Sequence, residues 1–309
     1  MWESTCWPQL RQLCGIRLPE DGAAALARGL PSLEVLEAMP EGPWTGAGQA
    51  VFGCVRQAKL KDCCESFTAH ARVSSLLPSL ERLTMYESVT INNLHEWEEL
   101  NTGTERQGLL VPDLADATRL TYLVLVCNDD DEGYHALPPH AWATLSTLPH
   151  LRHLALDVTA AEVPQLAHLP AALEVLKVQV DGLYYDQAED SMLLRRHDVD
   201  GPCELCAVLM AAGRLPRLRS LWIHASGMQV HRGALAGLAG ARLGDLEELE
   251  VKCYGLQLHD VSLLAALHGL RRLHVKELES ASPGEWSRST RAEGCRSRVS
   301  ATALDVLTF

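Results

Sequence analysis

The sequence predicts an α/β solenoid, in which short strands stack into one curved parallel sheet and helices and loops cover the convex face. Three observations predict this fold. One apolar phrase recurs along the chain, and helical patterns lie between its copies. The hydrophobic fraction is 47%, but only 5% of residues are aromatic, so Leu and Ala supply most of the buried mass. Such a composition is expected where one small unit is stacked repeatedly.

The recurring phrase is an apolar residue, two free positions, an apolar residue, one free position and a third apolar residue. Leu-Pro often precedes it. The copies are WPQLRQL (from Trp7, degenerate), LPSLEVLEAM (Leu30), LPSLERLTMY (Leu77), RLTYLVLV (Arg119), LPHLRHLAL (Leu148), LPAALEVLKV (Leu169), LPRLRSLWI (Leu215), DLEELEV (Asp245) and GLRRLHV (Gly269).

Three of the steps between successive copies are close to the lower twenties, and two are nearly twice that. The first apolar residues of the copies are separated by steps of 23, 47, 40, 31, 22, 45, 28 and 24, and they are Leu10, Leu33, Leu80, Leu120, Leu151, Leu173, Leu218, Leu246 and Leu270. A weak copy, Val55-x-x-Ala58-x-Leu60, halves the step of 47, whereas nothing divides the step of 45. We therefore expect nine to ten parallel strands, one per phrase.

These phrases resemble the leucine-rich repeat family, whose signature is L-x-x-L-x-L-x-x-N/C-x-L over roughly 20–29 residues. The resemblance covers residues 7 to 278 and implies the ribonuclease-inhibitor-like version with irregular repeats. At the ninth position the chain departs from the consensus but keeps small polar residues that are able to hydrogen-bond a neighbouring backbone group, namely Ser88, Asn128, Thr159, Asp181 and Ser226. Tyr254 breaks this series.

Helical patterns fill several connections between phrases. Apolar residues recur at three- and four-residue steps, and we expect Asp21 and Asp260 to cap two of the helices, which run over 21–30, 203–215, 232–243 and 259–270. The solenoid then spans 1–278, with loop insertions near 89–112, 128–141 and 181–202. Residues 279–309 form a disordered Ser/Arg-rich tail. Its apolar ending, TALDVLTF, is either a docking segment or an accident of gene prediction.

Charge and targeting signals narrow the setting. A net charge of −13 and a pI near 5.4 argue against a nucleic-acid partner, because that needs a basic face. We find no signal peptide and no apolar run that could span a membrane. Ten irregularly spaced cysteines then indicate free thiols in a reducing compartment. We expect a cytoplasmic monomer, with the axoneme of a cilium or the nucleus as alternative locations.

Each candidate motif for catalysis, cofactor binding or metal binding is incomplete. The acidic run from Asn128 to Gly133 resembles a calcium loop, but the twelfth position is Pro139 instead of Glu. Cys203 and Cys206 form a lone CxxC, which could be a redox or metal motif. Both residues are equally well explained as small, buried, hydrophobic residues of a helix. His95-Glu96-Trp97-Glu98-Glu99 lacks the second His of a zinc protease. We expect no enzyme, no cofactor and no metal.

Strand alternation identifies the concave face, which solenoids use to hold partners. Between the second and third apolar positions the strands carry Thr84, Val124, Ala155, Lys177, Trp222, Glu250 and His274. After the third they carry Tyr86, Val126, Asp157, Gln179, His224, Lys252 and Lys276. Trp222 is expected as an interface anchor, unless an insertion or the tail covers it. The candidate partner-binding residues are Tyr86, His153, Asp157, Lys177, Trp222, His224, Glu250 and His274.

The sequence thus predicts an intracellular scaffold that binds a protein partner of unknown identity, without nucleic acid or membrane. Similar irregular repeats also serve in substrate-recognition subunits of ubiquitin ligases, where an F-box precedes the repeats. No forty-residue helical module precedes the first phrase here. Axonemal and GTPase-regulating roles, also seen among similar proteins, remain open.

Overall fold

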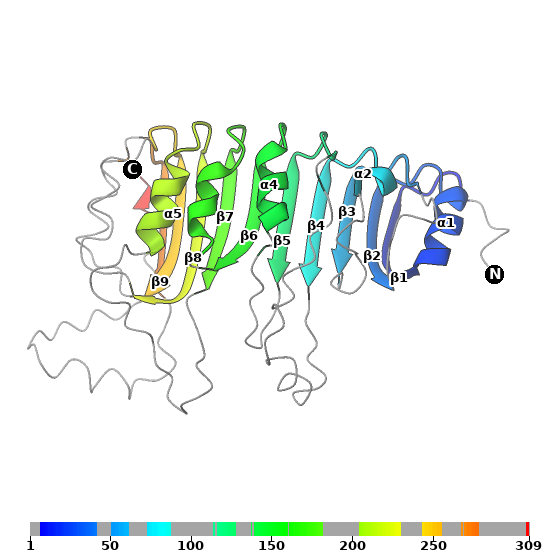
Figure 1. The fold of residues 1–309 in the computed structure, drawn as a ribbon, viewed down its shortest axis with the longest axis horizontal. Coiled ribbons are helices and arrows are strands. Elements are labelled where there is room, and N and C mark those ends of the chain that lie inside the picture. Colours follow the sequence, from blue (N-terminus) through cyan, green and yellow to red (C-terminus); the bar gives the residue numbers. More distant parts are fainter. Residues whose placement is uncertain are drawn as a thin grey trace, which may run out of the picture.

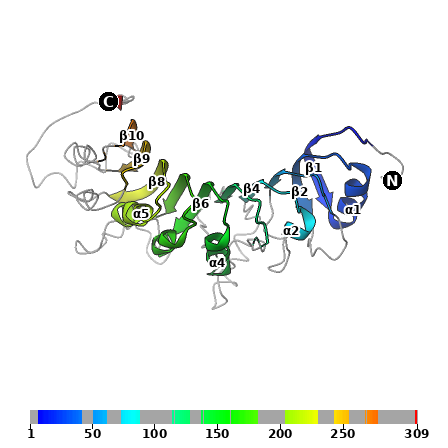
Figure 2. The ribbon, with the colours of Figure 1, turned by 90° about the horizontal axis from the view of Figure 1, so that it is seen from above.

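The computed structural model describes residues 7–41, 51–61, 73–87, 114, 116–127, 137, 139–159, 161–181, 204–229, 243–254, 267, 269–277 and 307–308. Within these residues, one sheet contains eleven strands arranged in sequence order. Neighbouring strands from β1 to β10 are all parallel. The sheet curves into an arc when viewed from above (Figure 2). This confirms the predicted α/β solenoid.

Each of the ten parallel strands coincides with one copy of the phrase, including the degenerate first copy and the weak copy at Val55. Their bounds are β1 Gln12–Pro19, β2 Val35–Glu41, β3 Gln57–Lys61, β4 Arg82–Glu87, β5 Tyr122–Cys127, β6 His153–Thr159, β7 Val175–Asp181, β8 Ser220–Gln229, β9 Glu248–Tyr254 and β10 Arg272–Glu277.

The core consists of Leu side chains stacked in register. Leu83, Leu123, Leu154, Leu176, Leu221 and Leu249 occupy the second apolar position of successive phrases and are fully buried. Strand pairing sets each directly beside the next. Burying one such side chain contributes about 2–3 kcal/mol, and no strand could bury this face alone. Stacking is therefore what stabilises the individual repeat.

Helices cover the convex side of the sheet (Figures 1 and 2). They are α1 Glu20–Gly29, α2 Val73–Leu76, α4 Pro139–Thr147 and α5 Glu204–Ala212, together with the 3₁₀ helix η1 Val163–His168. α1 and α5 match two predicted helices. The other two, 232–243 and 259–270, lie almost wholly outside the described residues.

Two local predictions need correction. Asp21 does not cap α1, because the helix begins one residue earlier and Pro19 occupies the N-cap without a side-chain hydrogen bond. Thr159 does not bond the turn backbone through its hydroxyl. Its hydroxyl donates to the carboxylate of Glu162 at 2.9 Å, and the same carboxylate accepts the Thr159 N–H. Glu162 thus takes the hydrogen-bonding role expected of the ninth residue.

The two ends of the sheet are built differently. In β1, Gly15 has a φ of 71° and the register shifts between Leu13 and Ile16, which forms a bulge at the exposed edge. A bulge twists an edge strand and hinders its pairing with another chain. At the other end, β11 Leu307–Thr308 pairs antiparallel with β10. Leu307 and Thr308 of the apolar ending therefore lie beside β10.

Most segments expected as insertions or tail lie outside the described residues, including the acidic run at Asn128. Of the ninth-position series, Thr159, Asp181 and Ser226 lie in described strands, and the other members lie outside the described residues. α4 begins at Pro139, so the last three residues of the stretch 128–141 belong to a helix. Of the CxxC pair, Cys206 is described, and it lies partly buried on α5 against the core.

Candidate functional site

Three rows of side chains point outward from the concave side, since alternation leaves three outward positions per phrase. The first row, before the second apolar position, holds Arg82, Tyr122, His153, Val175, Ser220, Glu248 and Arg272 on β4 to β10. The second and third rows are the two series predicted above, apart from Val126 and Lys276, whose side chains lie outside the described part of the structure. Because the strands are in register, members of one row lie side by side along the sheet.

A stack of three side chains occupies the first row at the centre of the face. The Arg82 guanidinium lies 4.1 Å from the centroid of the Tyr122 ring. On the next strand, the His153 ring stacks on Tyr122 with centroids 4.3 Å apart and an interplanar angle of 21°. A cation over an aromatic face is attracted by the ring quadrupole. The stack joins three neighbouring strands and fixes Tyr122 and His153 as rigid, flat groups on β5 and β6.

His153 is neutral at physiological pH. Burial within the stack, reinforced by the charges of Lys177 and Arg82, lowers the pKa of its imidazole from 6.5 to about 4. Both of these causes disfavour the protonated ring. A neutral imidazole can donate one hydrogen bond and accept another, so His153 offers a partner polar groups without a charge.

A second cluster is centred on Trp222 in the C-terminal half. The Lys177 ammonium lies 3.6 Å from the centroid of the indole ring. The indole Nε1–H donates to the Ser220 hydroxyl at 3.0 Å, and this hydroxyl donates to Glu248 at 3.1 Å. Arg272 pairs with the same Glu248 carboxylate at 3.3 Å. The Trp222 ring is therefore partly exposed yet held from its edge and from one face.

A third cluster lies towards the N-terminal half. Glu37 pairs with Lys61 at 2.8 Å and with Lys59 at 3.5 Å, and Lys59 lies 5.2 Å from the Tyr86 ring centroid. The hydrogen bond from Lys61, with further help from Lys59, holds the pKa of the Glu37 carboxyl below its ordinary value. This cluster connects β2, β3 and β4 through charge.

The remaining predicted site residues extend the C-terminal cluster. Asp157 and Glu250 are partly exposed and each makes a further polar interaction. His224 lies beside Lys252 in the register, and burial together with that lysine lowers the pKa of His224, which Glu250 partly opposes. His274 is partly exposed on β10.

Between the clusters, two side chains of the second row are buried. Val124 and Ala155 have only 8% of their surface exposed, less than expected for residues predicted to face solvent. They lie in the row next to the Tyr122–His153 stack. The centre of the face therefore presents the rings and not the aliphatic side chains.

The structure brings Lys177, Trp222, His224 and Glu250 together on three adjacent strands, whereas Tyr86 belongs to the separate N-terminal cluster. Sequence reasoning missed Arg82, Tyr122, Ser220 and Glu248. The signal was available, because these residues stand in the same phrase position as His153, which was predicted.

Within the described part of the chain, no group of three or more His, Cys, Asp or Glu side chains is placed to hold a metal ion. The helices described there are all too short or too polar to cross a membrane.

The fold and its face define a leucine-rich-repeat-like solenoid. No protein-family model and no curated protein matches the sequence. Among solved structures, internalin C2 from Listeria monocytogenes str. 4b F2365 is similar, at 16% identity and a TM-score of 0.35, over 86% of this chain and 80% of that one.

Proposed function

We propose that the chain is a protein-interaction scaffold that binds a protein partner through its concave face. The observation that carries this proposal is the state of Trp222, a large ring that is partly exposed and yet fixed by Lys177 and Ser220. Trp anchors in fixed conformations dominate many interfaces, because little conformational entropy is lost when they bind.

The surroundings of Trp222 suit an interface. His224 lies on the same strand, while Asp157 and His153 lie on β6, separated from β8 only by β7. A central aromatic group among charged and polar side chains has the composition of a hot spot with a polar rim. The second aromatic group, Tyr122 on His153, extends this surface towards the middle of the arc.

Within the leucine-rich-repeat class, we favour the ribonuclease-inhibitor-like version. α1, α4 and α5 lie on the convex side in the connections that lead to β2, β6 and β8. η1 replaces an α-helix before β7, so the repeats are irregular. The concave sheet is then the broad surface left for a partner.

The test compares partner capture by matched variants. Proximity labelling with the wild-type chain, followed by mass spectrometry, supplies candidate partners, and purified candidates are then titrated against variants. Trp222→Ala and Asp157→Lys should weaken binding, the second in a salt-dependent way. Met210→Ala is the control, because Met210 is 49% exposed on α5 at the convex side.

Thermal melts accompany every titration. Asp157→Lys should leave the melting temperature nearly unchanged, and Trp222→Ala should lower it by a few degrees at most, because the partly exposed ring loses only its contacts with Lys177 and Ser220. If Trp222→Ala unfolds the protein, the ring is core and the anchor is lost from the proposal. If Met210→Ala weakens binding and the concave variants do not, the partner binds the convex side.

A further inference from the structure

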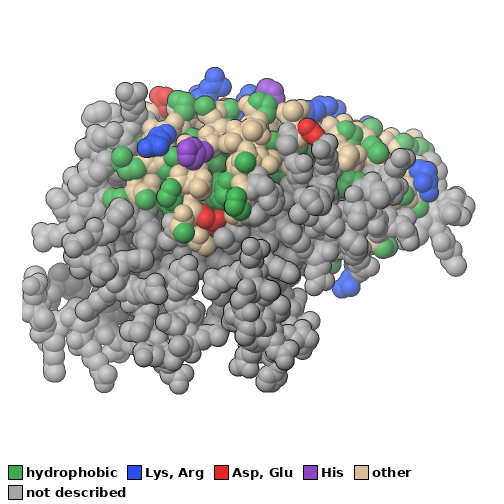
Figure 3. Space-filling view, in the orientation of Figure 1, with side chains coloured by type: hydrophobic (Ala, Val, Ile, Leu, Met, Phe, Trp, Pro, Cys, Tyr) green, Lys and Arg blue, Asp and Glu red, His purple; other side chains and the backbone are tan. Residues whose placement is uncertain are grey.

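One residue per repeat, charged in every repeat but one, lies at the edge where the strands begin. It follows the first apolar residue of the phrase, and its carbonyl oxygen accepts two N–H groups from the next repeat. The Arg11 oxygen, for example, accepts from Glu34 at 2.8 Å and from Val35 at 2.9 Å. This repeated geometry sets one side chain per strand along the edge: Arg11, Glu34, Arg56, Glu81, Thr121, Arg152, Glu174, Arg219, Glu247 and Arg271. Lys and Arg groups recur along this border in Figure 3.

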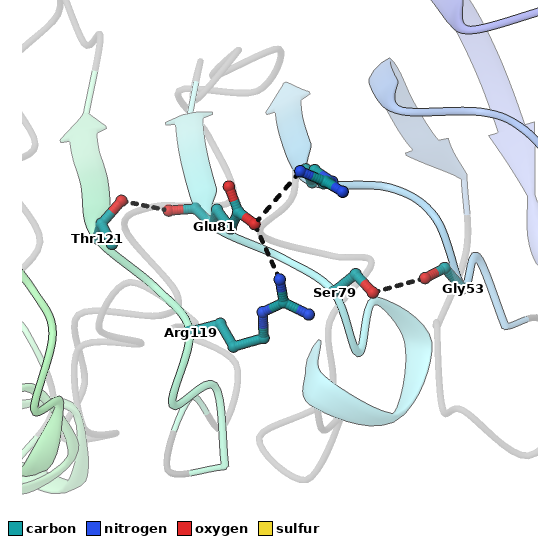
Figure 4. A network of polar contacts seen from close by, with 6 residues as sticks. Gly53, Ser79, Glu81, Arg119 and Thr121 are labelled. Carbon is teal, nitrogen blue, oxygen red and sulfur yellow. Dashed lines mark hydrogen bonds and ion pairs between the residues drawn. The ribbon is translucent and has the colours of Figure 1, made fainter.

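The sign alternates along this edge series and is interrupted at β5. Thr121 stands there instead of a charge, and its hydroxyl donates to the Glu81 carbonyl oxygen at 3.1 Å. Arg119, two residues earlier, reaches the Glu81 carboxylate at 3.0 Å. The same carboxylate lies 3.9 Å from Arg56, so two guanidinium groups share one acid (Figure 4).

A groove of about 580 Å³ runs along this edge from β1 to β5. Arg11, Arg56 and Arg119 line it, and among its lining residues the one acid is Glu34. Even with Glu81 counted beside them, three cations face two acids. This positive groove belongs to a chain whose net charge is −13.

The three guanidinium groups are accessible to a ligand. Their side chains are 75%, 63% and 55% exposed, and Arg11 and Arg56 lie 3.5 and 3.9 Å from their acid partners. Exposed pairs of this kind contribute about 0–1 kcal/mol each. Each guanidinium carries five N–H donors in a planar fork that fits a carboxylate. An acidic group of a ligand can therefore replace these ion-pair partners at a small cost in free energy.

The spacing selects a shape. Arg11 and Arg56 stand at equivalent positions two strands apart, about 9.6 Å along the sheet. Arg56 and Arg119 approach the same Glu81 oxygen at 3.9 and 3.0 Å, so they form one cationic pair. An extended polyproline II segment places a side chain on the same face every third residue, about 9.3 Å apart. We propose that this groove binds an extended acidic peptide with two Asp or Glu residues three positions apart, one beside Arg11 and the other beside the Arg56–Arg119 pair. This surface is distinct from the concave face.

The C-terminal half of the same edge provides an internal control. A groove of about 500 Å³ there is lined by Arg217, Arg219 and Arg271, but also by Glu174, Asp245 and Glu247. Three cations are balanced by three acids. The two grooves share the backbone geometry and differ in charge, so only the first should attract an acidic peptide.

The experiment measures fluorescence anisotropy of a labelled twelve-residue peptide, (Glu-Pro-Ser)₄, on the full chain. Wild type should bind at low ionic strength and more weakly at physiological salt. The double variant Arg56→Gln/Arg119→Gln should lose about tenfold in affinity, since two charged contacts are removed. Arg219→Gln/Arg271→Gln and Trp222→Ala should bind as wild type. Thermal melts confirm that each variant is folded.

Three comparisons can overturn the proposal. An isomeric peptide with its four Glu residues contiguous should bind more weakly, and equal binding refutes the spacing argument. Inorganic phosphate or a single-stranded oligonucleotide that displaces the peptide at comparable concentration shows a general anion site instead. Absence of binding by wild type, or equal loss in both double variants, refutes the groove itself.

Discussion

The Lys177 ammonium lies 3.6 Å from the centroid of the Trp222 ring, although 45 positions separate the two residues in the sequence. They are directly paired in the register of β7 and β8. A cation over indole contributes about 0.5–1 kcal/mol at an exposed site and more where water is displaced. A double-mutant cycle on the free energy of unfolding, with Lys177→Met and Trp222→Leu, should give a coupling of about that size. Lys61→Met, on distant β3, should be additive with Trp222→Leu.

The buried Leu row predicts a sharp contrast between neighbouring positions. Leu154, Leu176, Leu221 and Leu249 are fully buried. Changing any of them to Ala should lower the free energy of unfolding by about 2–5 kcal/mol, through lost transfer energy and a residual cavity. Lys177→Ala, one residue after Leu176, should cost only about 1 kcal/mol, because it loses the contact with Trp222 but leaves no buried cavity. Chemical denaturation measures both, and equal losses would contradict the register.

The strands could be predicted because the phrase carries their register. Aligning the copies sets Leu154 beside Leu176 and also sets Tyr122 beside His153, so the Tyr–His stack could have been predicted from the sequence. The hydrogen bonds of Glu162 could not be predicted in this way. Its carboxylate partners are Leu137 just before α4, Trp142 on α4 and Thr159 at the end of β6, and they follow no period, so only the folded connections bring them together.

The charged edge was overlooked for another reason. A charge at a strand entry is usually a solvated side chain, and one copy alone gives no hint of function. The alternation of Arg and Glu is visible only after all ten phrases are aligned, and its interruption at Thr121 is compensated by Arg119, which lies outside the aligned position. The groove therefore depends on Arg119 taking the place of a charge at position 121, and the repeat pattern does not identify Arg119.

The buried carboxylate of Glu162 predicts a stability effect at a position that no repeat pattern identifies. It accepts hydrogen bonds from Leu137 N–H at 2.6 Å, from Trp142 Nε1–H at 3.2 Å and from both donors of Thr159 at 2.9 Å. Glu162→Ala should cost about 2–4 kcal/mol, because buried donors lose their acceptor. Gln165→Ala, exposed in the same 3₁₀ helix, should cost less than about 0.5 kcal/mol. A loss for Glu162→Ala as small as the control would contradict this network.

Two glycines in successive strand entries predict opposite responses to one added methyl group. A Cβ at Gly269 would collide with the backbone oxygen of Gly244, whereas a Cβ at Gly244 would meet nothing within 4 Å. Gly269→Ala should destabilise the last repeats by about 1–3 kcal/mol, because backbone cannot move aside cheaply. Gly244→Ala should change stability by less than about 1 kcal/mol. Thermal unfolding of the two variants measures the difference.

The pKa of His153 predicts how stability changes with pH. The folded pKa of about 4 lies below the ordinary 6.5, so between these values the unfolded chain binds a proton that the folded chain does not. His153 therefore lowers stability progressively as pH falls from 6.5 to 4, and has no pH-dependent effect above 6.5. In His153→Gln this contribution is absent. The free energy of unfolding of the variant minus that of wild type should rise as pH falls through this window and level off outside it. Urea titrations at several pH values measure this difference, and NMR of the His153 ring should give a midpoint near 4. A flat difference, or one that falls with falling pH, would show that the ring is not held neutral by Lys177, Arg82 and the stack.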